Sequence, residues 1–473
     1  MRYLLFLFSP ILVAPAFSSP HQHEGSVTVG EQSYNYVAEC DFLPIADETG
    51  KKIATVFYAS YTKKGTDRRR PITFCFNGGP GSSTAWLHMG AFGPNRFLTE
   101  EACTSPPYIW IENQETLLPA TDLVFIDSIG TGFSICQDQS NPYRYAETMA
   151  DIESLKKAVS LYLQKEQRWN SPKYLIGESY GAIRVAGLAE ALHEEGIYLE
   201  GAIFLSPALD YKVLGSSPYA FHGQIFSLPT YFLTGWHHQK AFQGQTLEEV
   251  VAFSKMFTTR KYVPFILSDA CQDLEARQSM AKELASGTGI EENIWLENGL
   301  ELDLFSFATS FFAEERELVG FYDTTSHSGY FPNLSSNNQD PSSTPTLGMF
   351  CAGIQSYFSE ELGFSPPRPY KLLSYDLFHH WDFSSLEQRN YSFVHALEEA
   401  MGAHPTMRVF SASGYFDLVT PFAAAEYTFA KLDPRFYNNV TVQNYEGGHM
   451  MYLKERARKR LCQDLFSFYE SAQ

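Results

Sequence analysis

Five short apolar runs, separated by stretches long enough for helices, limit what this chain can fold into. Each run is apolar throughout instead of alternating with polar residues, which is typical of strands buried on both faces of a parallel sheet. The runs are residues 71–77, 122–127, 173–178, 201–206 and 407–413. Helices that cross over on both faces would bury such strands. The pattern therefore predicts an α/β fold with a mostly parallel central sheet and helices on both faces.

The rest of the chain divides around these runs. Residues 26–39 and 51–62 alternate and carry β-branched and aromatic side chains, which predicts antiparallel strands before the parallel ones. After about residue 210 the pattern becomes helical and aromatic. We predict core segments at 19–210 and 369–473, with an inserted helical cap at 211–368 over the carboxyl edge of the sheet. The segments expected to be helical are 145–167, 180–194, 237–242, 246–257 and 276–285, and a polar loop is expected at 333–346.

The N-terminus has the pattern of a secretory signal peptide. Arg2 provides a positive start, residues 3–13 are apolar, and small residues near Ala16 offer a cleavage site. No later apolar run has the length of a transmembrane helix. We therefore predict that residues 1–18 are removed, that the mature chain is secreted or periplasmic, and that it makes no stable membrane insertion.

Composition excludes some partners and cofactors. The formal net charge of -19 argues against nucleic acid and anionic membranes, since both bind clustered Lys and Arg. The seven cysteines form no C-x-x-C pair, so the sequence predicts no metal site and no cofactor. Export would permit disulfides, and we expect one or two at most, with the pairing left open. Nothing in the sequence specifies an oligomeric state.

A G-x-S-x-G pattern at residues 177–181 has Ser179 at its centre. By itself the pattern is weak, because glycine is a common residue. Here it follows an apolar strand and precedes a predicted helix, which is the setting of a nucleophile elbow. A serine hydroxyl becomes a good nucleophile only when a base takes its proton. The sequence therefore predicts a base and an orienting acid elsewhere in the chain.

Two segments late in the chain offer that acid and base. Asp417 follows the strand at 407–413, and His449 follows a strand-like run at 438–446. A lone histidine or aspartate is more often structural, and the chain has 13 histidines. The order Ser179, Asp417, His449 is nevertheless that of α/β-hydrolases. The joint pattern favours a catalytic triad in which His449 takes the serine proton and Asp417 orients the imidazole.

The stretch FNGGPGSST, residues 76–84, crowds three glycines after an early strand. A dinucleotide fingerprint would need glycine in place of Thr84, and a phosphate-binding P-loop would need a lysine that is absent. A tight turn that merely needs glycine is the structural alternative. With a nucleophile elbow in the chain, the loop fits one arm of an oxyanion hole. The predicted donors are the backbone N–H groups of Gly79 and Tyr180.

The motifs NGGPGSS, GPNRF, FIDSIGTGFS, GESYG, SGYFD and GGHM together resemble the serine carboxypeptidase family, in its secreted or periplasmic bacterial form. They are spread over residues 76–450. The resemblance implies an α/β-hydrolase core with a helical cap, and removal of C-terminal residues from peptides that have a free C-terminus. It also implies that Asn77, Gly78 and Glu178 bind the substrate's terminal carboxylate, and that Met450 lines the pocket for the leaving residue.

The chain departs from the family pattern at three places. Ala91 stands where a second glutamate often pairs with Glu178, so protonation of Glu178 must rest on burial or on another group. His88 is close in sequence, but a structural role explains it equally well. Ser82 replaces a frequent cysteine, and the proline-rich stretch common after the histidine is missing. We therefore expect a weaker preference for a free carboxylate, or a higher pH optimum, than in relatives with both glutamates.

The leading functional prediction is a serine carboxypeptidase that acts through an acyl-enzyme on Ser179. An esterase or acyltransferase on the same scaffold is the alternative, since the cap decides what attacks the acyl group. A non-catalytic peptide-binding protein is an alternative of another class. Retention of all three triad residues argues against it.

Overall fold

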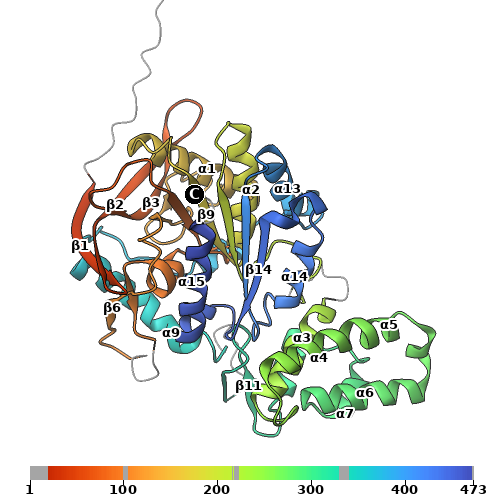
Figure 1. Ribbon diagram of the computed structural model, residues 1–473. Helices are drawn as coiled ribbons and strands as arrows, with labels where there is room; N and C mark the ends of the chain where they lie inside the picture. The colour runs from red at the N-terminus through yellow and green to blue at the C-terminus, as the bar shows by residue number, and fades with distance from the viewer. Residues whose placement is uncertain (1–19, 100–104, 216, 218–222, 330–339, 471–473) are drawn as a thin grey trace, which may run out of the picture.

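One large sheet runs through the core of the protein. The computed structural model describes residues 20–99, 105–215, 217, 223–329 and 340–470, and Figure 1 shows their arrangement. The predicted signal peptide and residues 333–339 of the predicted polar loop lie outside the described residues. The strand order is β1-β2-β3-β7-β4-β9-β10-β13-β14, with β8 paired to β3.

The strands of this sheet are antiparallel from β1 to β7 and parallel from β7 to β14. They are β1 (His21–Val29), β2 (Gln32–Ala46), β3 (Lys52–Lys63), β4 (Ile72–Phe76), β7 (Asp122–Ile126), β8 (Ile135–Cys136), β9 (Lys173–Glu178), β10 (Gly201–Leu205), β13 (Arg408–Gly414) and β14 (Val440–Tyr445). Two small antiparallel pairs stand apart: β5 (Asn95–Phe97) with β6 (Trp110–Glu112), and β11 (Glu317–Val319) with β12 (His327–Gly329). The five predicted parallel strands are thus confirmed.

The apolar runs reflect burial on both faces of the sheet. On β7, Val124 and Ile126 join one apolar cluster, whereas Leu123 and Phe125 join a second cluster on the opposite face. The helices of the first cluster include α1 (Thr148–Lys165), α2 (Gly181–Glu194) and α13 (Val394–Ala403). The second includes α15 (Glu455–Glu470) and the helical segment η1 (Trp86–Phe92).

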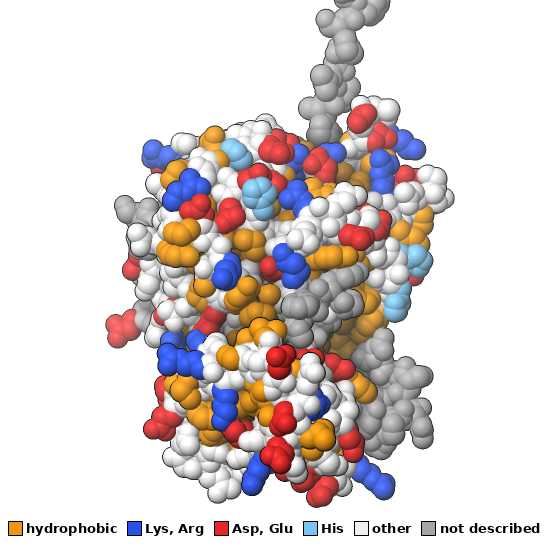
Figure 2. Space-filling view, turned by 90° about the vertical axis from the view of Figure 1, so that its right-hand side faces the viewer, with side chains coloured by type: hydrophobic (Ala, Val, Ile, Leu, Met, Phe, Trp, Pro, Cys, Tyr) orange, Lys and Arg blue, Asp and Glu red, His pale blue; other side chains and the backbone are white. Residues whose placement is uncertain are grey.

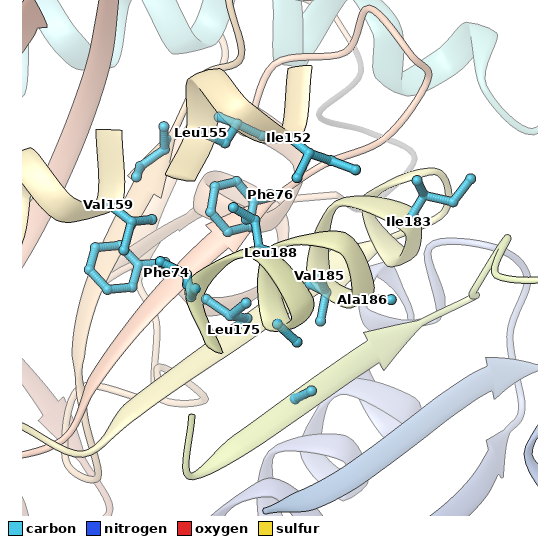
Figure 3. Packing of buried hydrophobic residues seen from close by; sticks show 14 of the residues in the cluster. Phe74, Phe76, Ile152, Leu155, Val159, Leu175, Ile183, Val185, Ala186 and Leu188 are labelled. Carbon is cyan, nitrogen blue, oxygen red and sulfur yellow. The ribbon is translucent and has the colours of Figure 1, made fainter. Parts of the chain in front are cut away.

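The packing beneath the predicted nucleophile is dense. Figure 3 shows Phe74 and Phe76 of β4 next to Leu155 of α1 and Leu188 of α2, all fully or almost fully buried. Each such side chain contributes about 1.5–3 kcal/mol through removal of apolar surface from water. This cluster fixes the start of α2 against the end of β4, where the glycine loop begins.

A second group of helices forms a lobe that projects from the core (Figure 1). It consists of α3 (Gln224–His237), α4 (Leu247–Phe257), α5 (Val263–Ile266), α6 (Leu274–Thr288), α7 (Glu292–Glu297) and α8 (Leu304–Ser310). Its own apolar core includes Phe232, Trp295 and Phe307, and it also takes in Leu418 from the main domain. Acidic, basic and apolar side chains are intermixed over the face in Figure 2. The predicted cap boundaries at 211 and 368 stay predictions.

The remaining helices lie between this lobe and the C-terminus. They are α9 (Thr344–Gly348), α10 (Ile354–Ser356), α11 (Tyr375–His379), α12 (Ser384–Gln388) and α14 (Phe422–Ala430). Among all the helices described, none has both the length and the apolar character needed to span a bilayer.

Two local expectations differ from the structure. The stretch 237–242 is not a helix, because α3 ends at His237 and both Gln239 and Phe242 have positive φ. The six cysteines among the described residues are all unpaired, so this part of the chain contains none of the expected disulfides.

Candidate active site

Ser179 lies in the tight turn between β9 and α2. Its φ of 59° is the left-handed conformation that such a turn requires. Close packing explains the flanking glycines. A Cβ at Gly177 would lie 2.2 Å from the Gly181 carbonyl oxygen, and one at Gly181 would lie 2.5 Å from the Phe76 carbonyl oxygen. The G-x-S-x-G pattern therefore corresponds here to a strand–turn–helix that only glycine permits.

Asp417 and His449 are brought together from the loops after β13 and β14. His449 Nδ1 lies 2.7 Å from Asp417 Oδ2, and both residues are buried. The other carboxylate oxygen, Oδ1, accepts hydrogen bonds from the backbone N–H groups of Val419 and Thr420, at 2.8 and 3.0 Å. The Thr420 hydroxyl donates to Oδ2 at 2.6 Å. Asp417 is thus held in one orientation facing the imidazole.

Burial by itself lowers the pKa of His449, but Asp417, through its charge and hydrogen bond, and the nearby carboxyl groups of Glu178 and Asp340 together raise this pKa. The Ser206 hydroxyl donates to the His449 carbonyl oxygen at 2.6 Å. The His449 N–H donates to the carbonyl of Tyr322, whose ring packs at 5.2 Å from the imidazole. The backbone and one ring face of His449 are therefore fixed.

The turn between β11 and β12 connects both loops. Besides the bond from His449, the Phe321 carbonyl accepts from the Leu418 N–H at 3.0 Å. The Thr324 N–H donates to the Phe416 carbonyl at 2.9 Å. This turn therefore stabilises the loops that present Asp417 and His449.

The glycine loop contacts the start of α2. A Cβ at Gly78 would lie 2.5 Å from the backbone nitrogen of Tyr180, so glycine is required for this approach. Gly79 follows with a φ of 102°. The two predicted oxyanion donors, the N–H groups of Gly79 and Tyr180, therefore come from backbone segments that are in contact.

Glu178 forms a buried polar cluster beside Ser179. Its Oε2 atom accepts from Asn77 Nδ2 at 3.0 Å and from the Tyr452 hydroxyl at 2.6 Å. Asn77 Oδ1 in turn accepts from the Leu87 N–H at 3.1 Å. Burial raises the pKa of Glu178 to about 7, although His449, Tyr452 and Asn77 each act to lower it.

No motif in the sequence pointed to Tyr452. It lies in a short helical turn, η8 (Met451–Leu453), and its ring packs so closely on η1 that a Cβ at Gly90 would lie 3.0 Å from it. The buried Ala91 is the next residue of η1. A phenol hydroxyl, and not a second carboxyl group, therefore contacts Glu178.

His88, the other candidate partner of Glu178, has a structural role. Its Nε2 lies 2.6 Å from the Tyr61 hydroxyl, and its ring stacks on Phe125 at 4.5 Å. Burial lowers the pKa of His88 to about 3, so the imidazole is neutral.

All the predicted site residues except Tyr180 and Asp417 line one cleft of about 390 Å³. Its lining includes Asn77, Gly78, Gly79, Ser82, Glu178, Ser179, His449 and Met450. Asp417 lies behind His449 and is fully buried. A larger hollow of about 710 Å³ between α4 and α15 contains none of these residues. No group of three or more potential metal ligands occurs among the described side chains.

Comparison with known proteins agrees with these motifs. The family model for serine carboxypeptidases matches residues 30–224, which include the glycine loop and the Ser179 turn. Over residues 30–224 the chain is therefore similar to serine carboxypeptidases. This match ends before the segments that carry Asp417 and His449.

Individual relatives are distant. Serine carboxypeptidase-like 35 of Arabidopsis thaliana is 24% identical over 204 residues, which cover 39% of this chain and 40% of that protein. The pheromone-processing carboxypeptidase kex1 of Aspergillus niger is 26% identical over 163 residues, covering 34% of this chain and 25% of that protein. The chain thus spans less than half the length of these curated relatives.

One solved structure extends the similarity over nearly the whole chain. The prohormone-processing carboxypeptidase Kex1(Δ)p of Saccharomyces cerevisiae superposes with a TM-score of 0.58 at 15% identity, covering 91% of each chain. At this identity the likeness concerns the fold. The α/β-hydrolase fold predicted from the sequence is therefore confirmed.

Proposed function

We propose that this protein is a serine carboxypeptidase, which releases the C-terminal residue of peptides through an acyl-enzyme on Ser179. One observation carries the proposal. The cleft that contains Ser179 and His449 also contains the Asn77–Glu178 pair. These two side chains could hydrogen-bond to a carboxylate next to the scissile bond. The match of residues 30–224 to the family model for serine carboxypeptidases supports the same activity.

The triad would act on the last peptide bond. Because Nδ1 of His449 faces Asp417, Nε2 is the nitrogen available to take the proton of Ser179. The serine oxygen attacks the carbonyl carbon, and His449 passes the proton to the leaving amine. Water then attacks the acyl-enzyme with His449 again as base, which releases the shortened peptide and restores Ser179. The N–H groups of Gly79 and Tyr180 would bind the oxyanion in both steps.

The Asn77–Glu178 pair would select the free C-terminus. A carboxyl group can donate a hydrogen bond to the substrate's carboxylate only while it is protonated. Since burial raises the pKa of Glu178 to about 7, the group is protonated in mildly acidic solution and loses its proton as the pH rises through neutrality. Met450 lines the same cleft and would contact the leaving residue's side chain.

A digest of a peptide library tests this function. Each sequence is supplied both as the free acid and as the C-terminal amide, and the products are read by mass spectrometry. We expect peptide acids to lose single residues from the C-terminus and the matching amides to react much more slowly. Hydrolysis of esters without turnover of any peptide acid would instead identify an esterase or acyltransferase.

The pH dependence should reveal the role of Tyr452. Above pH 7 Glu178 ionises and repels the substrate's carboxylate, so KM for peptide acids should rise there while KM for amides stays level. The Tyr452 hydroxyl lowers the pKa of Glu178. In Tyr452→Phe the pH at which KM rises should be about one unit higher. This shift corresponds to the loss of one hydrogen bond to a charged group.

Tyr469→Phe is the matched control for this shift. Tyr469 is also buried, and its hydroxyl lies 2.8 Å from Thr73 Oγ1 in the core, away from the cleft. The Tyr469→Phe variant should show the same dependence of KM on pH as the wild type. A downward shift in Tyr452→Phe, or a KM for peptide acids that is level through pH 7, would contradict the role given to Glu178.

We also propose that the protein is exported, because residues 1–18 have the pattern of a signal peptide. Mass spectrometry of the protein recovered outside the cytoplasm should place the mature N-terminus near residue 19. An intact N-terminus there would contradict cleavage.

A further inference from the structure

Arg184, on the second turn of α2, is a buried cation with no part in the triad. Its side chain is 1% exposed. Nε donates to Asp151 Oδ2 of α1 at 2.7 Å, and Nη2 donates to the Ser128 hydroxyl at 3.0 Å. The remaining nitrogen, Nη1, donates to the backbone carbonyls of Asn77 and Gly78, the latter at 3.3 Å. The guanidinium therefore joins the helix behind Ser179 to the glycine loop.

The bonds to these carbonyls fix the direction of two N–H groups. The cis peptides in the described chain are Gly79-Pro80 and Pro106-Pro107, so the bonds from Asn77 to Gly78 and from Gly78 to Gly79 are trans. In a trans peptide, C=O and N–H point in opposite directions. Carbonyls turned toward Arg184 therefore turn the N–H groups of Gly78 and Gly79 away from it. Both glycines line the cleft that contains Ser179.

The other bonds of the loop hold its two ends: the Asn77 side chain bonds to Glu178 and to the Leu87 N–H, and the Gly81 carbonyl accepts from the Ser374 N–H at 2.7 Å. Glycines carry no side chain that could anchor them, and Gly79 adopts a φ of 102°. The Gly78 carbonyl also accepts a 3.2 Å bond from the Ser82 N–H, which lies within the same loop. Arg184 supplies the attachment to a rigid helix. A cation on the carbonyl also polarises the peptide, which makes its N–H a stronger donor.

We propose that Arg184 is a positioning residue that aims the Gly79 N–H at the oxyanion. This rests on the proposed serine chemistry but not on the choice of peptide or ester as substrate. The alternative is that the Arg184–Asp151 pair only stabilises the packing of α1 on α2. A buried ion pair can be structural, so the two roles must be separated by a kinetic measurement.

Arg184→Met and Arg184→Lys test the proposal. Active protein is counted by fluorophosphonate titration, and kinetics are followed with peptide acids and with an activated p-nitrophenyl ester. Loss of one oxyanion donor lowers kcat by about 10²–10³-fold, so a misdirected donor should lower kcat by about 10–10²-fold. KM should change by less than about threefold. Affinity for a peptidyl boronic acid, which forms a tetrahedral anion on serine, should fall in step with kcat/KM.

Arg168→Lys is the matched control. Arg168 is equally buried and bonds to Asp122, Ser171 and the Arg70 carbonyl, none of which lines the cleft. It should lower the melting temperature while leaving kcat within twofold. Arg184→Lys keeps the charge. If Arg184→Met does not fold, the kinetics of Arg184→Lys distinguish the positioning role from the purely structural one.

Three results would overturn the proposal. One is a kcat in both Arg184 variants within threefold of the wild type. Another is a loss of kcat no larger than in Arg168→Lys. The third is a rise in KM at unchanged kcat, which would place the effect on Asn77 and substrate binding. If the wild type cleaves the ester but no peptide acid, the carboxypeptidase assignment fails while the ester kinetics still test Arg184.

Discussion

Replacing Ser179 by alanine should lower kcat for release of C-terminal residues on the order of 10⁶-fold, because the acyl-enzyme can no longer form. The fold should persist. Ser179 already occupies a left-handed φ of 59°, and alanine there adds a strain of only about 1 kcal/mol. The measurement is the release of a free amino acid from an N-blocked dipeptide, together with the mass shift produced by a fluorophosphonate probe.

Ser411→Ala is the control for the Ser179 variant. Ser411 is fully buried in β13, and its hydroxyl has no partner among the described residues. The Ser411→Ala variant should keep full activity and should still be labelled by the fluorophosphonate probe. Undiminished peptide cleavage by Ser179→Ala would refute the triad, and probe labelling of that variant would identify a different nucleophile. An unlabelled wild type would favour the non-catalytic peptide-binding protein.

The features predictable from sequence are those with a local physical cause. A strand buried on both faces must be apolar throughout, so the parallel strands could be recognised from their composition. A turn that admits no side chain must be glycine, so the Ser179 turn was visible as a spaced motif. Contact between Asp417 and His449 could be expected because each follows a strand at the same edge of the sheet.

The features that could not be predicted depend on contacts between distant segments. Tyr452 reaches Glu178 across 274 positions of sequence, and nothing in GGHMMY distinguishes its hydroxyl from that of a surface tyrosine. Arg184 is the single charge near the start of α2, but its partners lie on three other segments. The stretch 237–242 contains good helix formers, yet positive φ at Gln239 and Phe242 ends the helix there.

Asp417→Asn is expected to lower kcat by about 10⁴-fold through the wrong imidazole tautomer. The backbone N–H groups of Val419 and Thr420 need an acceptor, so the amide oxygen of the new side chain should stay where Oδ1 is now. Its NH₂ group then replaces Oδ2 and donates to His449 Nδ1. The imidazole proton is consequently placed on Nε2, which can no longer accept the proton of Ser179.

Thr420→Val separates this electronic effect from a loss of packing. It removes the 2.6 Å bond to Oδ2 but keeps the carboxylate facing His449. We expect a fall in kcat of about tenfold or less, the equivalent of one hydrogen bond of about 1 kcal/mol. The single-turnover rate with an activated ester measures both variants at the acylation step. If Asp417→Asn kept more than a tenth of the wild-type rate, Asp417 would not be the orienting acid. The next residue to replace would then be Asp340. Its carboxyl group is buried, and its charge also raises the pKa of His449.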